Sequence, residues 1–558
     1  MMQRKYLWKG ALVGLLFFSV GFVTNIAGDF FEISKNMEIY GNVYSELNKV
    51  YVDETNPTEL MRTGIDAMLT SLDPYTNYYS ESQIEYSKLL SSGQYSGIGA
   101  EIRKTDEGYQ ISELFGGGPA DLAGLKVGDM LIKIDSESLD PESLDQDQVM
   151  SLLLGEKGSQ VAITVTRGSE AIEQTIDVKR GGTEGRQENV PFFKRVDERI
   201  GYILLSGFTQ DAGKEVAEAL QEMKKEAGGL NGVILDLRGN PGGRVDEAVN
   251  VVNVFVPANE RIVEMRGRTK ESQQTFPTRF PAIDPEIPLA VIVNSKSASA
   301  SEIVSGAIQD LDRGVIVGRR SFGKGLVQNV RPLSYNTQMK ITIARYFIPS
   351  GRCIQAIDYF HRKEDGTAGR VPDSLFQEYK TRNGRPVFDG GGIYPDVIVE
   401  KPALHPATQA LVSQNMIFDF ATQYSLSHDS IAGPRDFELS DADYDSFVAF
   451  AQGKDFAFQT ATESQLDVFA KSLEKESYQE ALADELAALR DKLNRQKSQD
   501  LVERRVEISD LIRKEIVNRY FYKQGVLESG FTFDADIQAA LKVLNDPAKY
   551  QTTLQTEE

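Results

Sequence analysis

The chain has 558 residues, too many for a single hydrophobic core, so three or more domains are expected. Its 41% hydrophobic and 26% charged residues are ordinary for globular proteins, and its net charge of −21 argues against nucleic-acid binding. The single cysteine, Cys353, excludes an intramolecular disulfide framework and is interpreted as a small, half-buried structural residue.

Residues 1–29 have the pattern of a targeting segment. Basic residues between Arg4 and Lys9 precede an apolar run from Gly10 to about Val23, which is typical of an export signal. The run is also long enough for one membrane anchor, which needs about 17–25 residues. Positive charges keep that end in the cytoplasm, so the body is predicted to be exported to the periplasm or the extracytoplasmic face of the membrane. No clean A-x-A cleavage site is visible, and anchored and released forms both stay open.

Residues 30–90 are predicted to be a helical region that serves packing or dimerisation, which makes a homo-oligomer one alternative. Apolar residues recur at helical spacing before and after Pro57, and the turn Leu72-Asp73-Pro74-Tyr75 ends the pattern.

Residues 91–182 change to a strand pattern. Gly97-Ile98-Gly99-Ala100 leads into strands at 101–103 and 108–114, and a glycine-rich run at 118–129 precedes a strand at 130–134. A short helix follows near Leu152.

A buried strand at 233–238 ends in the turn Gly239-Asn240-Pro241-Gly242-Gly243, and a helix is predicted at 245–252. Such a turn exposes backbone N–H groups, although it also serves simple chain reversal. The phosphate-loop pattern GxxxxGK[ST] is absent. Asp236 and Arg238 are interpreted as a structural pair.

The stretch 289–328 contains the candidate chemistry. It predicts a buried strand at 289–293, a helix with one apolar face at 303–311, and a strand at 315–317 before Gly323-Lys324-Gly325. A serine at a strand-to-helix turn is well placed for nucleophilic attack, because N–H groups at a helix start can hold an oxyanion. Chemistry alone does not choose between the serines at 297, 299 and 301. Ser299 and Glu302 also fit a capping box, and Gly-Lys-Gly also fits a plain turn.

The nucleophile needs a base. The three histidines lie in a charged insert (His361), before a proline (His405) and in a polar loop (His428), and none has a context that supports a triad. Lys324 serves if burial lowers its pKa from about 10.4 to about 7–8. Gln328, four residues on, can accept from or orient the amine.

These residues resemble the C-terminal processing peptidases, the tail-specific proteases of the S41 serine peptidase family. The resemblance rests on Ser297 to Ile303 (SASASEI), on Phe322 to Gly325 (FGKG) with Gln328, and on LDLRGNPGG at 235–243. It implies that Ser299 is the nucleophile, Lys324 the general base and Gln328 its support. The oxyanion hole is assigned to the backbone N–H groups of Ala300, Gly242 and Gly243. The fold implied is multidomain α/β, with a crotonase-like protease core over 183–402.

Residues 91–182 resemble a PDZ domain, a module that captures an extended peptide and holds its C-terminal carboxylate. The resemblance places Gly97, Ile98, Gly99 and Ala100 at the carboxylate. The side-chain pocket is assigned to Val149, Leu152 and Leu153, for which the domain's own core is the alternative. Many relatives carry arginine where this chain has Leu154, and the LDPY turn at 72–75 takes the place of LDPH in the family.

A polar insert at 356–389 is predicted to be a surface excursion near the mouth of the active site. Residues 403–558 are charged and predicted to be helical, with one long pattern over 464–518, and they fit packing or dimerisation as well as regulation.

The sequence predicts an exported serine endopeptidase that binds the C-terminal tails of protein substrates, and it implies no metal, no cofactor and no nucleic-acid partner. An uncleaved N-terminal segment would add the membrane as a partner. Two alternatives stay open, a non-catalytic PDZ scaffold of the cell envelope that binds tails and a hydrolase or transferase of small acyl substrates.

Overall fold

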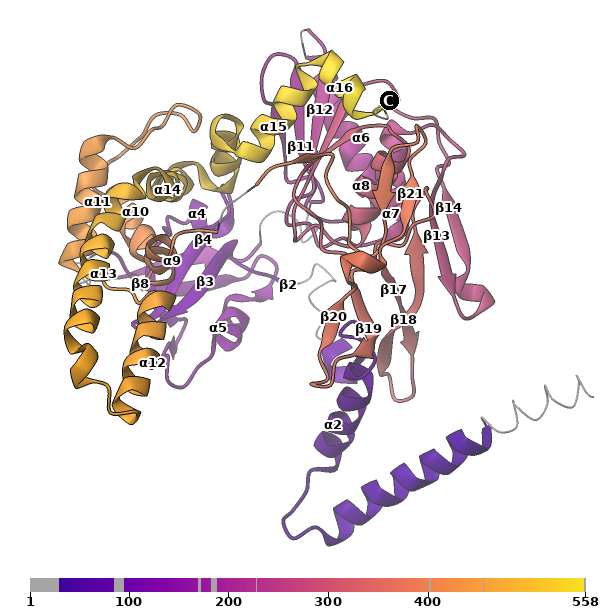
Figure 1. Cartoon of the computed structure of the whole chain (residues 1–558), viewed down its shortest axis with the longest axis horizontal. Helices are drawn as coiled ribbons and strands as arrows, with labels where there is room; N and C mark the ends of the chain where they lie inside the picture. Colours follow the sequence, from indigo (N-terminus) through magenta and orange to yellow (C-terminus); the bar gives the residue numbers. More distant parts are fainter. Residues whose placement is uncertain are drawn as a thin grey trace, which may run out of the picture. The chain divides into compact units, whose positions relative to one another are not determined.

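The computed structural model describes residues 30–84, 95–168, 172–181, 188–226, 228–400, 403–454 and 456–555 (Figure 1). The predicted export segment, 1–29, lies outside the described residues. Within the described ranges, no helix has the length and apolar character that crossing a membrane requires. The chain divides into two compact units, one formed by residues up to Glu81 together with Gln328–Thr342, and the other by the remainder.

The first unit begins with a helix that runs to residue 50 and continues with α2 (Pro57–Thr70). The side chain of Asn56 caps α2, and Pro57 occupies its first turn, where the missing N–H costs nothing. Within the region predicted as helical, β1 (Asn77–Tyr79) is instead a strand, paired antiparallel with β18 (Gln338–Phe347). Three residues are too few to show a strand period, so the sequence pattern missed it.

The protease core of the second unit is built on a six-stranded sheet in the order β10-β11-β12-β15-β16-β23. All neighbours are parallel except β10 and β11. The strands are β10 (Phe192–Arg195), β11 (Ile200–Leu204), β12 (Gly232–Asp236), β15 (Leu289–Val293), β16 (Val315–Gly318) and β23 (Val397–Ile398).

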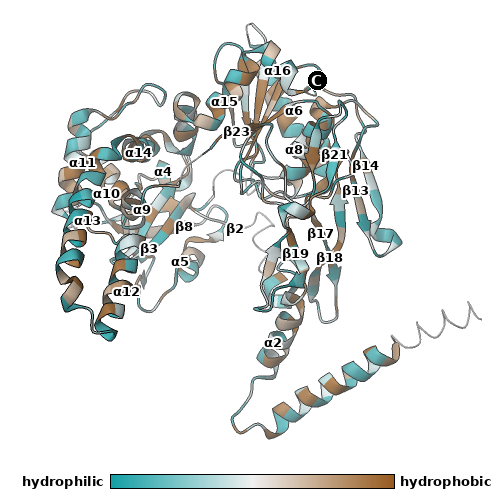
Figure 2. Cartoon of the chain, viewed as in Figure 1, coloured by the Kyte–Doolittle hydropathy of each residue, from teal (hydrophilic) through white to brown (hydrophobic). Residues whose placement is uncertain are grey.

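Helices cover both faces of this sheet, because its central strands are apolar on both sides. One face packs against α6 (Ala212–Lys225), α7 (Val245–Phe255) and α8 (Ala300–Asp310). The other packs against α15 (Ala535–Leu544) and α16 (Pro547–Thr553). Figure 2 shows brown, hydrophobic residues in the sheet between these layers.

The remaining core strands form a second sheet and the insert. The second sheet holds β13 (Arg261–Gly267), β14 (Gln274–Pro277), β17 (Leu326–Pro332) and β18, and η2 (Lys270–Ser272) lies between β13 and β14. The insert contains β19 (Ile357–Arg362), β20 (Ala368–Arg370), η3 (Asp373–Leu375), β21 (Glu378–Lys380) and β22 (Pro386–Phe388). The polar stretch predicted at 356–389 therefore folds into two short antiparallel pairs, β19 with β20 and β21 with β22.

The region predicted as a PDZ domain is a small sheet with its own apolar core. Its elements are β2 (Tyr95–Ser96), β3 (Ala100–Thr105), β4 (Gly108–Leu114), α4 (Pro119–Leu122), β5 (Met130–Ile134), β6 (Glu137–Ser138), α5 (Gln146–Leu153), β7 (Gly155–Glu156), β8 (Gln160–Thr166) and β9 (Glu173–Lys179).

The C-terminal residues are helical, as predicted; α9, α10, α11 and α14 share an apolar core, and Leu501 of α13 packs against it. They comprise α9 (Pro406–Ser413), α10 (Met416–Ser427), α11 (Asp441–Gly453), α12 (Ala461–Lys475), η4 (Glu480–Leu482), α13 (Ala483–Glu503) and α14 (Arg505–Phe533). The single long pattern predicted over 464–518 is wrong, because it is split among three helices. The chain turns after α12 at Ser477, whose φ is 63°, and again between α13 and α14 at Arg504.

Candidate active site

The three candidate serines occupy different environments at the start of α8. Ser297 is buried and donates its hydroxyl to the carbonyl of Leu237 at 2.8 Å, and Ser301 is buried and donates to the carbonyl of Asn240 at 3.0 Å. Ser299 is half-buried and begins the helix as its N-cap. Burial therefore separates two enclosed, hydrogen-bonded hydroxyls from Ser299, which is partly accessible to solvent.

Ser299 has a φ of 57° and a ψ of −113°, a conformation that side-chain-bearing residues rarely adopt. Such backbone strain costs on the order of 1–3 kcal/mol and persists only where the surroundings hold it. Here the carbonyl of Ser299 accepts from the N–H groups of Glu302 and Ile303, and its own N–H is bound by the Glu302 carboxylate. This backbone conformation lets the chain turn into α8 at Ser299.

The Glu302 carboxylate accepts hydrogen bonds from Ser299 and from the loop at 319–325, here called the lysine loop because it carries Lys324. Its Oε2 accepts from the backbone N–H groups of Ser299 and Lys324, each at 2.9 Å. Its Oε1 accepts from the N–H of Gly323 at 2.7 Å and from the hydroxyl of Ser321 at 2.5 Å. One oxygen thus bridges the backbones of Ser299 and Lys324, which brings two predicted site residues together. The sequence pattern showed Glu302 only as a capping residue, and its second set of donors lies too far along the chain to be read from that pattern.

The Glu302 carboxylate is fully buried, and burial raises its pKa to about 7 against the pull of its four hydrogen bonds. It is therefore a titratable group within the site at neutral pH.

The loop that carries Lys324 is fixed on both sides. The Tyr346 hydroxyl donates to the Lys324 carbonyl, and the Gly325 N–H donates to Oε1 of Gln355 at 2.7 Å. Gly323, with a φ of +89°, leaves no room for a Cβ, which would stand 2.3 Å from Cβ of Ala356. The first residues of the insert therefore support the lysine loop directly.

The glycine turn after β12 lies against the serine. A Cβ on Gly242 would stand 2.8 Å from both Cβ of Ser299 and N of Ala300. The Gly242 N–H donates to Oδ1 of Asn240 at 2.9 Å. The N–H groups of Ala300 and Gly243 donate to no atom within the described ranges. Of the three predicted oxyanion donors, these two present an available N–H, and Gly242 provides the close approach.

Gln328 lies on β17 in the first unit. Its Nε2 donates to Oγ1 of Thr342 at 3.2 Å, and the Thr342 N–H donates to Oγ1 of Thr76 at 3.2 Å. The Thr76 hydroxyl in turn donates to the Asp73 carboxylate at 3.1 Å. The LDPY turn is thereby connected to the strand pair that carries Gln328.

Asp236 and Arg238 form the ion pair expected of them, with Nη2 to Oδ2 at 2.6 Å. Asp236 also accepts from the Tyr202 hydroxyl at 2.7 Å, and its charge, together with burial, raises the pKa of that tyrosine.

Comparison with known proteins identifies the family. The model of peptidase family S41 matches residues 199–359, a PDZ domain model matches 116–167, and the model of the C-terminal helical domain of probable PDZ-proteases matches 407–544. The chain is 31% identical over 325 residues to the carboxy-terminal-processing protease of Bartonella bacilliformis. The match covers 58% of this chain and 73% of the relative. The chain belongs to the carboxy-terminal processing proteases of peptidase family S41. The predicted family and fold class are confirmed, and the protein is a serine-type peptidase.

Other relatives of this S41 protease are similar over a comparable span. It is 32% identical over 321 residues to a probable CtpA-like serine protease of Staphylococcus aureus, covering 57% of this chain and 62% of that relative, less than two thirds of its length. Among solved structures, a photosystem II D1 C-terminal processing protease is 24% identical with a TM-score of 0.35, and the match covers 65% of this chain and 92% of that one.

The residues predicted to bind the carboxylate lie between β2 and β3 of the PDZ domain. The carbonyls of Ile98 and Gly99 accept from Ala120 and Phe115, whereas the N–H groups of Gly97, Ile98 and Gly99 donate to no described residue.

The predicted side-chain pocket of the PDZ domain is less open. Val149 and Leu153 are buried in the domain core, and Leu152 is half-buried against it. Of the three, Leu152 has the most accessible side chain.

The histidines of the S41 protease are engaged locally. His361 pairs with Asp358 at 2.7 Å, His405 caps α9, and His428 stacks on Tyr424. The hydrogen-bond and stacking partners of all three histidine rings in the described residues are local ones, and Ser299 is not among them.

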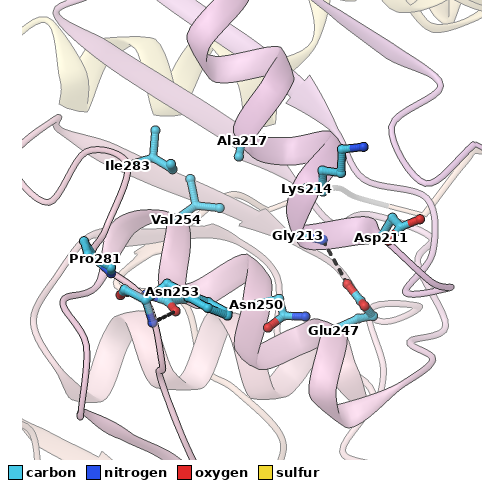
Figure 3. A pocket seen from close by; sticks show the side chains of 11 residues that line it. Asp211, Gly213, Lys214, Ala217, Glu247, Asn250, Asn253, Val254, Pro281 and Ile283 are labelled. Atoms are coloured by element: carbon cyan, nitrogen blue, oxygen red, sulfur yellow. Dashed lines mark hydrogen bonds between the residues drawn. The ribbon is translucent and has the colours of Figure 1, made fainter.

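A hollow of about 310 Å³ lies between α6 and α7, and none of the predicted site residues lines it (Figure 3). Glu247 in its wall accepts from the Gly213 N–H at 3.1 Å, and Asn253 donates to the carbonyl of Phe280 at 2.7 Å. These two side chains are therefore hydrogen-bonded within the wall itself.

Proposed function

We propose that this carboxy-terminal processing protease is exported and hydrolyses peptide bonds with a dyad of Ser299 and Lys324, after its PDZ domain has bound the C-terminal tail of a protein substrate. The observation that carries the proposal is the shared Glu302 oxygen, which accepts from the backbones of both residues at 2.9 Å. Export is supported by the basic and apolar residues of the 1–29 segment.

The reaction follows from these positions. Neutral Lys324 takes the proton of the Ser299 hydroxyl while Oγ attacks the peptide carbonyl carbon. The resulting oxyanion accepts from the N–H groups of Ala300 and Gly243, which donate to no other atom of the described residues. Protonated Lys324 then gives its proton to the leaving amine, and an acyl-enzyme remains. Water, deprotonated by Lys324, releases the product acid and restores Ser299.

Gln328 has a supporting role in this mechanism. Its Nε2 donates to Oγ1 of Thr342, which leaves the amide oxygen available as an acceptor. The bond to Thr342 thereby sets the orientation of the amide.

The PDZ domain binds the substrate through the free carboxylate at the C-terminus of the substrate. The available N–H groups at Gly97 to Gly99 match an anionic chain end, as in other domains that capture a C-terminus by strand addition. A tail that ends in an apolar side chain suits the half-buried Leu152 beside that loop.

The test is degradation of an unfolded protein with an apolar C-terminus by the purified full chain. We expect Ser299→Ala and Lys324→Ala to abolish cleavage, while Ser301→Ala, which removes a structural hydroxyl, keeps it. The same substrate with an amidated C-terminus should show a raised KM and a nearly unchanged kcat. A Ser299→Ala variant that still cleaves, or an amidated tail with an unchanged KM, would contradict the dyad or the tail-binding role respectively. Fractionation of cells tests export separately.

A further inference from the structure

An ion-pair cluster lies where the C-terminal helices meet the protease sheet. Arg238, just after β12, donates from Nη1 to both carboxylate oxygens of Asp534 at 2.8 Å and to Asp536 Oδ2 at 3.0 Å. The other side of the guanidinium is held by Asp236. The carboxylates of Asp236 and Asp534 hold the pKa of Arg238 above its usual value, and the Arg238 guanidinium, with the capping bond from the Ile537 N–H, holds the pKa of Asp534 below its own.

The same acid reaches a second catalytic loop. Arg319, just after β16, donates from Nη1 and Nη2 to the two oxygens of Asp536 at 3.1 and 3.0 Å. Its other recorded side-chain acceptor is the Val399 carbonyl at 3.3 Å. Asp536 is therefore the acid that contacts both arginines, and only 4% of it is exposed to solvent.

Each of the two arginines closely follows a strand that neighbours β15, and this position connects the cluster to the proposed active site. The order β12-β15-β16 places the strand that leads to Ser299 between the two strands that the arginines follow. Arg238 begins the turn that contains Gly242 and Gly243, and Arg319 begins the loop that contains Lys324. The Asp536 carboxylate thus contacts the first residue of the turn at 238–243, here called the oxyanion turn, and the first residue of the loop at 319–325 that carries Lys324.

Asp536 itself is held rigidly. Asp534 caps α15 by accepting from the N–H groups of Asp536 and Ile537 at 3.0 and 3.1 Å. Ile537, on the same helical turn, is buried against the protease sheet. A side chain held in this way at a helix start is a fixed reference point for the two loops.

We propose that Asp536, supported by Asp534, is a positioning residue for catalysis, supplied by the C-terminal helices to align the oxyanion turn with the lysine loop. The inference rests on the proposed dyad and deepens it. It predicts that loss of the carboxylate lowers the rate of the chemical step and leaves tail binding, which belongs to the PDZ domain, unchanged.

The experiment compares the full-length wild type with Asp536→Asn, Arg319→Gln and, as a matched control, Asp546→Asn. Asp546 caps α16 through the Lys549 N–H and contacts neither arginine, so its loss tests the docking of the C-terminal helices without touching the cluster. For Asp536→Asn and Arg319→Gln we expect kcat to fall about tenfold or more with KM within about twofold, since small misplacement of reacting groups has effects of this size. Asp546→Asn should keep wild-type kcat.

The double variant Asp536→Asn/Arg319→Gln should be no slower than the worse single variant, because both remove the same contact. A wild-type kcat in Asp536→Asn, measured while Ser299→Ala is inactive, would overturn this inference and leave the dyad standing. Activity in Ser299→Ala would instead overturn the dyad. If Asp536→Asn fails to fold, Arg319→Gln decides, and a wild-type kcat there overturns the inference.

Discussion

Gly242 leaves almost no space beside Ser299, the proposed nucleophile. Its φ is +99°, and an added Cβ would stand 2.8 Å from Cβ of Ser299. We expect Gly242→Ala to displace Ser299 and to lower kcat by about a hundredfold, since shifts of about 1 Å have that effect. The measurement is kcat for peptide cleavage, with thermal melting to check folding.

Gly239 offers the control for that substitution. It has a φ of +73° in the same turn, but no atom lies within 4 Å of an added Cβ. Gly239→Ala therefore carries the backbone strain, of about 1–3 kcal/mol, without the clash. If the two variants lose activity equally, strain rather than contact with Ser299 is the cause.

Glu302 makes stability depend on pH in a defined direction. Its pKa rises from 4.5 to about 7 on folding, so the folded state favours the protonated acid. The stability that this shift contributes is full below about pH 4.5 and is lost as the pH rises through about 7, a change of about 3 kcal/mol. Glu302→Gln does not titrate, so the advantage of wild type over this variant should shrink by about that amount between pH 4.5 and 8. Denaturant unfolding at the two pH values measures it, and a pH-independent difference would show that Glu302 is ionised throughout.

At the scale of elements, the hydrogen bonds of β18 bear on the orientation of Gln328. Thr342→Val removes the oxygen that accepts from Nε2 of Gln328 and leaves that amide without its partner. We expect kcat to fall to the level of Gln328→Ala, with no further loss in the double variant. Thr337→Val is the control, because the Thr337 hydroxyl bonds only within the turn between β17 and β18, to the Ser334 carbonyl. Wild-type kcat in Thr342→Val would separate this network from catalysis.

The elements also show what a sequence can predict. The strands at 108–114, 130–134 and 289–293 have the bounds that the sequence predicts, because apolar or partly alternating segments between small or polar residues mark both ends. Ser299, Lys324 and Gln328 were nominated by their motifs. The bridge by Glu302 was not, since a capping pattern contains no information about the loop 20 or so residues later that supplies its other donors.

At the scale of the whole molecule, the last two helices, α15 and α16, are a structural layer of the protease core. The sequence left packing, dimerisation and regulation open for them, because an amphipathic pattern predicts a buried face without naming its partner. The side chains of Ile537, Val543 and Leu544 pack against Ile234 and Ile292 of the sheet.

This layer predicts a large effect for a small change far from the active site. Ile537→Ala should lower the free energy of unfolding by about 2–5 kcal/mol, as other buried truncations do. Lys542→Ala, at an exposed position of the same helix, should change it by less than about 0.5 kcal/mol. Denaturant unfolding followed by circular dichroism gives both values, and equal effects would mean that α15 does not cover the sheet in solution.

The PDZ domain is joined to the same helices at Tyr522. That residue has a φ of 56° and a ψ of −167° within α14, a region otherwise almost confined to glycine, and its hydroxyl donates to Asp121 at 2.5 Å. Its ring contacts Gly116, in the loop beside the carboxylate-binding residues. The part of α14 after this kink therefore leads from the contact with the PDZ domain to Asp534, which caps α15.

The late position of α15 along the chain bears on biosynthesis. A ribosome completes Ser299, Lys324 and Gln328 well before it reaches Asp536 and the apolar residues that close the second face of the sheet. A nascent chain with all three proposed catalytic side chains therefore lacks the helical layer that covers the second face of their sheet, and it lacks Asp536. If Asp536 aligns the two loops as proposed, we expect proteolytic activity to emerge only near the end of translation.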